Sequence, residues 1–374
     1  MRIGIDVRVL EENEGGFERY LRLLLKGFEQ IDQRNEYFLY TDHEIKGLPS
    51  AKNFTYSFIE RRFHSQVWVN LSLVRSAVAD RIDVMHFPAS SVWINKKKRT
   101  IVTLHDIGPV LYPEFKMASP SMLSYFKFLF HQIKTKSDII VTVSRSSKKD
   151  IAQYLRVPDE KVKVVHSGID PVFRLMNDED VQRIRERFGL PQRFILFVGS
   201  FQVRKNLPGL MRAYNLFLSK YQLPHHLVIV GKTRQDVGSN YLKNKDLIAL
   251  VENKERIHFI GYQKEEDLVG IYNAAELFVL VSFYEGFGFP YLEAMACGTP
   301  VVGANNSSGP EIVGDVGILV NPLNPEEIAG AMASCLTDLR LRQSMIDKGL
   351  NRVKEYTPLS MAEETMRVYR EVCE

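Results

Sequence analysis

The segment SFYEGFGFPYLEAMACGTPVV, residues 282–302, carries the most informative pattern in the chain. An apolar run ends at its first residue, a glycine-rich turn follows, and a helix that begins near Pro290 stops at Gly298 before another apolar run. This order predicts strand, turn, helix and strand. Glu285 falls in the turn and Glu293 on the first turn of the helix, so the two carboxylates can address two ends of one elongated ligand. Alternatively, Glu293 complements the helix dipole and Glu285 is a solvated turn residue.

The turn between the strand and the helix also suits a phosphate group. Gly286 and Gly288 let the backbone come close to a ligand. The backbone N–H groups of Phe289 to Leu292 lie at the predicted helix start, where unsatisfied donors and the helix dipole favour an anion. We therefore expect the whole turn to line a ligand site.

Beyond this segment, short apolar runs alternate with longer amphipathic stretches along the chain. The pattern is typical of strands buried in a parallel sheet and joined by helices. The predicted strands are residues 3–7, 38–40, 84–87, 100–104, 139–143, 162–165, 194–198, 227–230, 257–260, 277–281, 301–302 and 318–320.

These two series of strands predict an α/β protein with two Rossmann-like, doubly wound domains. Sites in such domains lie at the carboxyl ends of the strands, so the two sites can face each other across a central cleft. Residues 171–192 have little apolar content and proline near both ends, which is typical of a linker. We expect an N-terminal domain at 1–170, a C-terminal domain at 193–357, and a C-terminal helix at 358–374 that packs back on the N-terminal domain.

The composition excludes several classes of protein. The 374 residues contain three cysteines without C-x2-C spacing, which argues against a disulfide framework or a structural zinc site and favours a reducing compartment. Asp6 and Arg8 interrupt the first apolar run, so it does not resemble a secretory signal. The apolar runs are strand-sized, well short of the roughly 20 residues of a membrane span. We therefore expect a cytoplasmic protein.

The net charge of +4 conceals an uneven distribution. Residues 1–165 carry 26 Lys and Arg against 19 Asp and Glu, whereas residues 166–374 carry 23 against 26. Residues 61–149 alone carry 15 against 5, interleaved with aromatic residues such as Trp68, Trp93 and Phe128. Such a surface suits an anionic membrane leaflet or a lipid-diphosphate acceptor. The alternative interpretation is that Phe126, Leu129 and Phe130 belong to the core and the lysines form a solvated face.

The arrangement E-x7-E, from Glu285 to Glu293, resembles the donor-binding signature of retaining glycosyltransferases of family four, which have the GT-B fold. Further segments resemble the same family in the same order, so the resemblance covers essentially the whole chain. It is most similar to bacterial transferases of O-antigen and other cell-envelope polysaccharides, including mannosyltransferases. These segments are MRIGIDVRVL (1–10), VTLHDIGPVLYPE (102–114), VTVSRSSKKDI (141–151), VVHSGIDPVF (164–173), VGSFQVRKNLPGLMRAY (198–214) and PEIVGDVGILVNP (310–322).

The resemblance implies roles for residues of the C-terminal half. Glu285 is expected to bind hydroxyls of the donor sugar, and Glu293 the ribose of the nucleotide. Arg204 and Lys205 are expected to hold the donor diphosphate, where fixed cations stabilise the departing negative charge. The alternative for this pair is two solvated surface residues. The remaining expected donor contacts are Gly199, Ser200, Gly286, Phe287, Gly288, Phe289, Pro290 and Leu292.

In the N-terminal half, the resemblance implies a glycine-rich loop and a histidine at the site. Gly15 and Gly16 precede a predicted helix, where backbone N–H groups can approach a phosphate. His105 follows a predicted strand and is expected to contact the donor sugar near the reacting carbon. Asp106 more simply caps a turn, and Ser144 a helix.

No metal cofactor is predicted. Asp178 and Asp180 have the D-x-D spacing of metal-dependent transferases, but they begin a predicted helix that runs to Phe188 and complement its dipole. The nine histidines include no H-x3-H pair with a nearby acid. The chain also lacks a G-x-G-x-x-G turn after its first strand and a P-loop, which argues against NAD binding and P-loop phosphate chemistry.

We therefore expect a hexosyltransferase that uses a nucleotide-diphosphate sugar, UDP-hexose or GDP-mannose, with retention of configuration. The acceptor would be a glycan or lipid-linked glycan at the inner face of the cell membrane, and nucleic acid is not an expected partner. Two alternatives stay open: a GT-B epimerase or phosphorylase, and a non-enzymatic module that binds an acidic polymer or RNA through residues 61–149.

Overall fold

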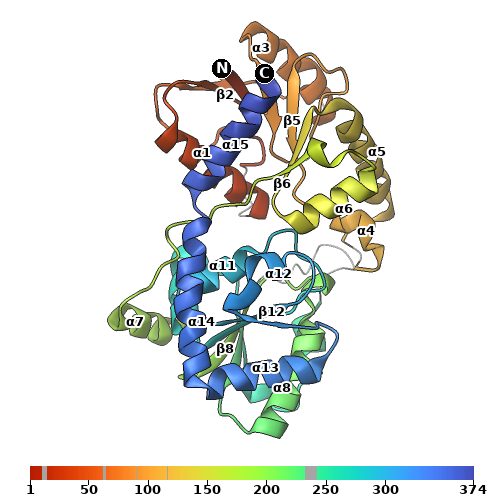
Figure 1. Ribbon diagram of the computed structural model, residues 1–374. Coiled ribbons are helices and arrows are strands. Elements are labelled where there is room, and N and C mark those ends of the chain that lie inside the picture. Colours follow the sequence, from red (N-terminus) through yellow and green to blue (C-terminus); the bar gives the residue numbers. More distant parts are fainter. Residues whose placement is uncertain (11–14, 62–64, 90, 116, 232–241) are drawn as a thin grey trace. The chain divides into compact units, whose positions relative to one another are not determined.

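A computed structural model describes residues 1–10, 15–61, 65–89, 91–115, 117–231 and 242–374 of the chain. Glu11, Glu12 and Glu14, in the acidic loop before Gly15, lie outside the described residues. The chain divides into two compact units. The first contains Met1–Leu111, Ala118–Gly168 and Tyr356–Glu374, and the second contains Tyr112–Met117 and Ile169–Glu355. Figure 1 colours both units by position in the sequence.

The first unit is built on a seven-stranded parallel sheet in the order β3-β2-β1-β4-β5-β6-β7. Its strands are β1 (Arg2–Asp6), β2 (Glu36–Thr41), β3 (Phe54–Phe58), β4 (Val84–Phe87), β5 (Arg99–Thr103), β6 (Ile139–Thr142) and β7 (Val162–Val164). Its helices are α1 (Gly16–Ile31), α2 (Ser65–Trp68), a π-helical turn (Val69–Leu73), α3 (Val74–Ala79), α4 (Gly108–Leu111), α5 (Pro120–Lys136), α6 (Arg145–Leu155) and α15 (Pro358–Cys373).

The last helix of the chain belongs to this first unit. α15 lies alongside α1, as Figure 1 shows. A Cβ atom at Gly27 would lie 2.2 Å from the Pro358 carbonyl oxygen, so only glycine allows the two helices to come this close.

The second unit has a six-stranded parallel sheet in the order β10-β9-β8-β11-β12-β13. This is the doubly wound order, with a switch point between β8 and β11. Its strands are β8 (Phe194–Val198), β9 (His226–Val230), β10 (Ile257–Gly261), β11 (Leu277–Leu280), β12 (Val301–Ala304) and β13 (Ile318–Val320). Its helices are α7 (Asp178–Phe188), α8 (Leu207–Tyr221), α9 (Asn244–Ile248), α10 (Glu265–Ala274), α11 (Phe289–Ala296), α12 (Gly309–Ile312), α13 (Pro325–Thr337) and α14 (Leu339–Arg352). The remaining short turns are 3-10 helices.

Several local predictions are confirmed. α7 begins at Asp178 and ends at Phe188, capped by the side chain of Asn177. Ser144 caps α6 by accepting a hydrogen bond from the backbone N–H of Ser147. Asp106 caps its turn by accepting from the N–H of Gly108.

The aromatic residues of the basic window are mostly core, which corrects part of the expected membrane surface. Trp68 and Trp93 are buried in the hydrophobic core of the first unit, together with Leu129 and Phe130. Phe126 packs against the same core. Tyr125 and Phe128 are exposed on α5. Burial of a large apolar side chain is favourable, so aromatic residues pack into the core even where their neighbours in the sequence are basic. Arg62, which belongs to the same basic window, lies outside the described residues.

Within the described part of the chain, no helix is both long and apolar enough to cross a membrane.

Candidate active site

The switch point of the second unit brings two predicted site segments together. β8 and β11 are neighbours in the sheet, and the chain leaves both at their carboxyl ends. β8 leads into the 3-10 turn Val203–Lys205, and β11 leads into the turn before α11. The backbone N–H of Phe283 donates to the carbonyl of Arg204, which joins the two turns directly. In doubly wound sheets, ligands bind at this position.

Arg204 and Lys205 both bind Glu285. The Lys205 Nζ lies 2.6 Å from Glu285 Oε1, and the Arg204 guanidinium donates to Oε2 at 3.0 Å. Arg204 also donates to the Tyr284 carbonyl. Lys205 and Glu285 are each only 6% exposed, whereas Arg204 is partly open to solvent. The two cations are therefore not a solvated surface pair, and Glu285 is not a solvated turn residue.

The pKa values of Glu285 and Lys205 depend on the charges around them. Burial raises the pKa of the Glu285 carboxyl, but Lys205 and Arg204 outweigh burial and lower it to about 2. Burial lowers the pKa of the Lys205 ammonium against the opposing effect of Glu285. Glu285 is thus a carboxylate at neutral pH, and the three side chains together retain a net positive charge. That excess suits an anionic ligand.

Two residues that sequence reasoning did not single out hold this cluster in place. Ser282 donates from its hydroxyl to Glu285 Oε1 at 2.6 Å. Asn206, at φ +54°, caps α8 and donates to the carbonyls of Val281 and Pro322. A serine three residues before Glu285 and an asparagine after the Arg-Lys pair are the signals in the sequence that indicate both.

A third residue missed from the sequence is Ser307, in the turn after β12. Its hydroxyl accepts a hydrogen bond from the backbone N–H of Glu285 at 3.1 Å. Ser307 has φ +44°, which is unusual for a residue other than glycine. The side chain of the preceding Asn306 donates to the Phe283 carbonyl. The turn after β12 therefore braces the turn that carries Glu285.

The glycine-rich turn ends at the N-cap of α11. Gly288 has φ +101°, and a Cβ atom there would lie 2.7 Å from the Tyr291 ring, so glycine is required. Phe287 is buried and its ring lies 5.2 Å from that of Phe289. Gly286 and Pro290 are half-buried.

Two expectations about α11 need correction. The helix begins at Phe289, so Glu293 lies in its second turn and does not serve the helix dipole at the N-terminus. Glu293 is buried and accepts a hydrogen bond at 2.8 Å from the hydroxyl of Tyr272, on α10. The Leu292 side chain is fully buried in the core, so it does not face a ligand. The backbone N–H of Tyr291 already donates to the Gly288 carbonyl. Fewer donors than expected are thus open at this helix start.

Gly199 and Ser200 follow β8 at the same edge of the sheet. The Gly199 N–H continues the ladder by donating to Val230. The Gly199 carbonyl oxygen lies 1.9 Å from the position that a Cβ atom on Gly231 would take. The close approach of these two backbone segments therefore depends on glycine at 231. Ser200 is half-buried.

The predicted site residues of the first unit gather at the carboxyl edge of its own sheet. Gly15 is the N-cap of α1, and both Gly15 and Gly16 are exposed. The ring of Phe17, next in sequence, lies 4.5 Å from the ring of His105, which follows β5. His105 donates through Nε2 to the Pro88 carbonyl at 2.9 Å. Burial lowers its pKa to about 4, so the imidazole is neutral at pH 7.

A buried network of hydrogen bonds lies next to His105. Its central residue, His86 on β4, contacts the hydroxyls of Tyr369 and Thr103, each at 2.7 Å. Tyr20 contacts the same Thr103 hydroxyl and packs its ring edge-on against His105. Burial, with a smaller effect of His105, lowers the pKa of His86 to about 3. Sequence reasoning missed His86 because a single histidine inside an apolar strand gives no pattern.

Among the described residues, no three His, Cys, Asp or Glu side chains gather closely enough to hold a metal ion.

Comparison with known proteins identifies both halves of the chain. Residues 14–173 match the family model "Glycosyltransferase Family 4", and residues 178–352 match "Glycosyl transferases group 1". O-antigen chain mannosyltransferase B of Escherichia coli is 29% identical over 300 residues, which is 79% of this chain and 76% of that protein. The serotype-specific mannosyltransferase WbdA of Escherichia coli is 27% identical over 88% of this chain, but the match spans only 42% of WbdA.

Solved structures agree on the fold. The sucrose-phosphate synthase of Thermosynechococcus elongatus superposes with a TM-score of 0.77 at 20% identity, covering 100% of this chain and 99% of that one. Anabaena HepE, solved with UDP-glucose, superposes with a TM-score of 0.76 at 18% identity over 99% of this chain and 100% of its own. The chain has two α/β units with parallel sheets, and the two family models match its two halves in order. It is therefore a glycosyltransferase with the GT-B fold that belongs to family four and resembles the O-antigen mannosyltransferases.

Proposed function

We propose that this glycosyltransferase moves a hexose from a nucleotide-diphosphate sugar, UDP-hexose or GDP-mannose, to a hydroxyl of a glycan or lipid-linked glycan, with retention of configuration. The observation that carries the proposal is the cluster of Arg204, Lys205 and Glu285 at the switch point of the second unit. Relatives named as O-antigen mannosyltransferases support a role in cell-envelope polysaccharide synthesis. The UDP-glucose held by Anabaena HepE, which shares the fold, belongs to the same class of donor.

The C-terminal domain, residues 193–357, would hold the donor. Arg204 and Lys205 would turn toward the diphosphate when it binds, while Glu285 accepts hydrogen bonds from hydroxyls of the sugar. Glu293 would bind the ribose, for which it must share its carboxylate with Tyr272 or exchange that partner. Gly199, Ser200 and the turn from Gly286 to Pro290 would line the donor with backbone atoms.

The N-terminal domain, residues 1–170, would bind the acceptor. The open backbone of Gly15 and Gly16 is suited to close approach of a phosphate or sugar. A neutral His105 with Nε2 engaged by Pro88 can offer its other ring nitrogen, Nδ1, as an acceptor to a sugar hydroxyl.

We propose front-face transfer for the chemical step. The bond between the anomeric carbon and the diphosphate oxygen breaks, and its electron pair leaves with the phosphate. The acceptor oxygen bonds to the same face of that carbon, and its proton passes to the phosphate oxygen that has just departed. Arg204 and Lys205 stabilise the negative charge that grows there, an effect that acts more on the transition state than on the bound donor.

We also propose that the enzyme works in the cytoplasm at the inner face of the cell membrane, where a lipid-linked acceptor would be held. The excess of Lys and Arg in residues 61–149 supports this location.

The proposal is tested by following release of the nucleoside diphosphate with UDP- and GDP-sugars, with and without a glycan acceptor. We expect release that depends on the acceptor, and a product whose anomeric configuration by NMR is that of the donor. Release of nucleotide without an acceptor, with epimerisation or phosphorolysis of the sugar, would instead support one of the other GT-B activities. An inverted product would reject retention.

A further inference from the structure

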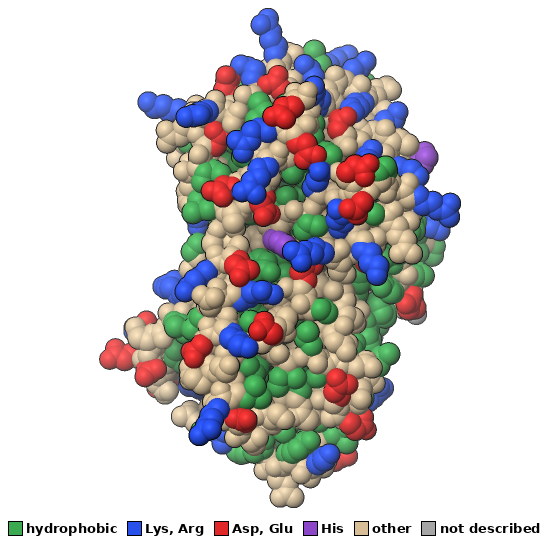
Figure 2. Space-filling model, viewed as in Figure 1, with side chains coloured by type: hydrophobic (Ala, Val, Ile, Leu, Met, Phe, Trp, Pro, Cys, Tyr) green, Lys and Arg blue, Asp and Glu red, His purple; other side chains and the backbone are tan. Residues whose placement is uncertain are grey.

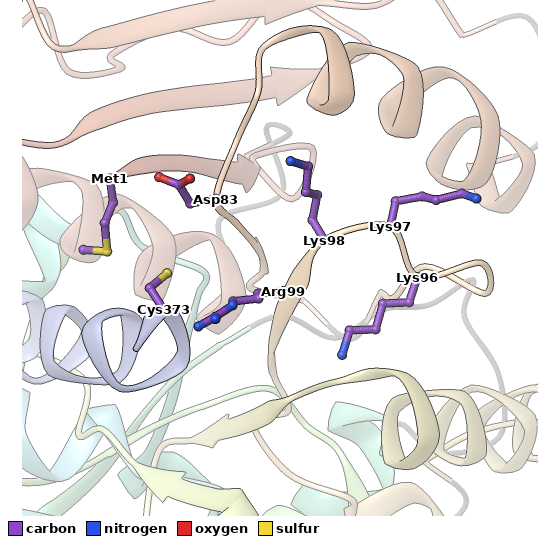
Figure 3. A pocket seen from close by; sticks show the side chains of 7 residues that line it. All are labelled: Met1, Asp83, Lys96, Lys97, Lys98, Arg99 and Cys373. Atoms are coloured by element: carbon purple, nitrogen blue, oxygen red, sulfur yellow. The ribbon is translucent and has the colours of Figure 1, made fainter.

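The first unit contains a cationic cavity on the side away from its predicted site residues. The cavity has a volume of about 710 Å³, and it is lined by Lys96 to Arg99, by Asp83 and by the end of α15 at Cys373 (Figure 3). Asp83 and Lys98 immediately precede β4 and β5, so the cavity lies at the amino-terminal edge of the sheet. His105 follows the opposite end of β5. The cavity is therefore separate from the predicted site residues of its own unit.

Of the four Lys and Arg side chains that line the cavity, two are held by described partners and two are not. Lys96 forms an ion pair with Asp138, and the Arg99 guanidinium donates to the Val372 carbonyl in the last turn of α15. Figure 3 shows Arg99 extending toward α15 while the three lysines fan out from the preceding loop. The side chains of Lys97 and Lys98 make no ion pair or hydrogen bond with any other described residue.

Further cations crowd the same edge. The Lys161 ammonium donates to the Lys134 carbonyl, just before β6. Burial lowers the pKa of Lys161, and Lys96 and Lys134 lower it further against the effect of Asp138. The positive charges at the amino ends of β5, β6 and β7 therefore repel one another, and Asp138 is shared among them. A bound anion would relieve this repulsion.

We propose that this cavity is a second anion site, which binds phosphate groups independently of the proposed sugar transfer. Several ammonium groups beside one fixed guanidinium offer many N–H donors to the oxygens of a phosphate. Exposed apolar side chains accompany them: Ile94 is 40% exposed, and its backbone N–H donates to Asn70, next to Leu71, which is 52% exposed. Cations beside exposed apolar groups suit the phosphates of lipid headgroups as well as a soluble phosphate.

Figure 2 shows that Lys and Arg side chains are spread over the visible face of the molecule, so the test must separate this cavity from general charge. We choose Lys97→Gln/Lys98→Gln as the site variant. The matched control is Lys26→Gln/Lys46→Gln, which removes the same charge from two exposed lysines of the same unit.

The experiment measures two ligands on the full chain. One arm is cosedimentation with vesicles of phosphatidylcholine, with and without phosphatidylglycerol, at low salt. The other arm is calorimetric titration with inorganic phosphate, which lacks the diphosphate that Arg204 and Lys205 are proposed to bind. We expect the wild type and the control to bind in at least one arm, with the site variant about 30-fold weaker, which corresponds to about 1 kcal/mol for each lysine. Binding in the vesicle arm alone would identify the source as lipid, and binding in both would identify a general phosphate site.

The proposal is overturned if neither ligand binds the wild type, or if the control variant loses as much affinity as the site variant. Binding of the sugar donor is measured in parallel and should be equal in all three proteins. If none of the three proteins binds the donor, that result would count against the proposed transferase site and not against this cavity.

Discussion

The Lys205 ammonium lies 2.6 Å from a carboxylate oxygen of Glu285, and both side chains are almost fully buried. The residues are 80 positions apart in sequence and follow strands β8 and β11, which are neighbours in the sheet. An ion pair of this kind costs desolvation energy, so it is weak evidence for stability on its own. It holds charged groups at the switch point, where we propose that an anionic donor binds.

Breaking this pair should destabilise the protein more than removing it. Lys205→Met leaves Glu285 with fewer partners in a buried place, and we expect the free energy of unfolding to fall by about 3 to 5 kcal/mol. The double variant Lys205→Met/Glu285→Gln should lose clearly less than the sum of the two single variants. Urea denaturation of the four proteins measures this coupling, and strictly additive losses would show that the two charges do not depend on each other.

Arg204→Gln should affect turnover far more than stability. Its guanidinium is partly open to solvent, and Glu285 keeps Lys205 as a partner when Arg204 is replaced. We expect turnover to fall about 100- to 1000-fold, as for the loss of one charge-stabilising donor at a transition state, with the unfolding free energy within about 1 kcal/mol of wild type. Arg212→Gln, on α8, is a control that should leave turnover unchanged.

Ser307 should act on catalysis through Glu285. In Ser307→Ala the N–H of Glu285 loses its partner, and we expect about a fivefold fall in turnover from the loss of about 1 kcal/mol. Ser307→Gly also lacks the hydroxyl but relieves the positive φ, so it should be more stable than Ser307→Ala and equally slow. If Ser307→Gly regains full turnover, backbone strain and not the hydrogen bond explains the defect.

Stability should decline as the pH falls below neutrality, in part because of His86. Its pKa is about 3 in the folded protein and near 6.5 in the unfolded chain. Between these values the unfolded chain binds a proton that the folded protein does not, so stability is full above about pH 6.5 and is lost toward pH 3. His86→Gln should reduce the slope of unfolding free energy against pH by about 1.4 kcal/mol per unit in this range. An unchanged slope in denaturation series at pH 6, 5 and 4 would contradict this.

Much of the fold follows from local pattern, but one strand does not. β4 and β8 coincide with the predicted ranges because every residue but one is apolar and all are at least partly buried. β3 was not predicted: it lies at the edge of the sheet, and residues such as Thr55 and Tyr56 remain exposed. An edge strand with one covered face lacks the continuous apolar run that marks a central strand.

The candidate site also contains features that the sequence predicted and features that it did not. The E-x7-E spacing and the resemblance indicated Arg204 and Glu285, but not that these side chains bind each other. That contact depends on the strand order, which places β8 beside β11 across a long separation in sequence. Ser307 was not predicted because its hydroxyl only accepts a hydrogen bond from the backbone N–H of Glu285, and such a contact leaves no spacing pattern in the sequence.

The central claim is that the switch point of the second unit binds a nucleotide-sugar donor through its cations, and donor titration tests it most directly. UDP-hexoses and GDP-mannose are titrated calorimetrically into the wild type and into Arg204→Gln. We predict that the wild type binds one of these donors and that the variant binds the same donor about tenfold more weakly, through loss of a charge-assisted contact. Equal affinity in the two proteins, or no binding of any of these donors to the wild type, would contradict the account.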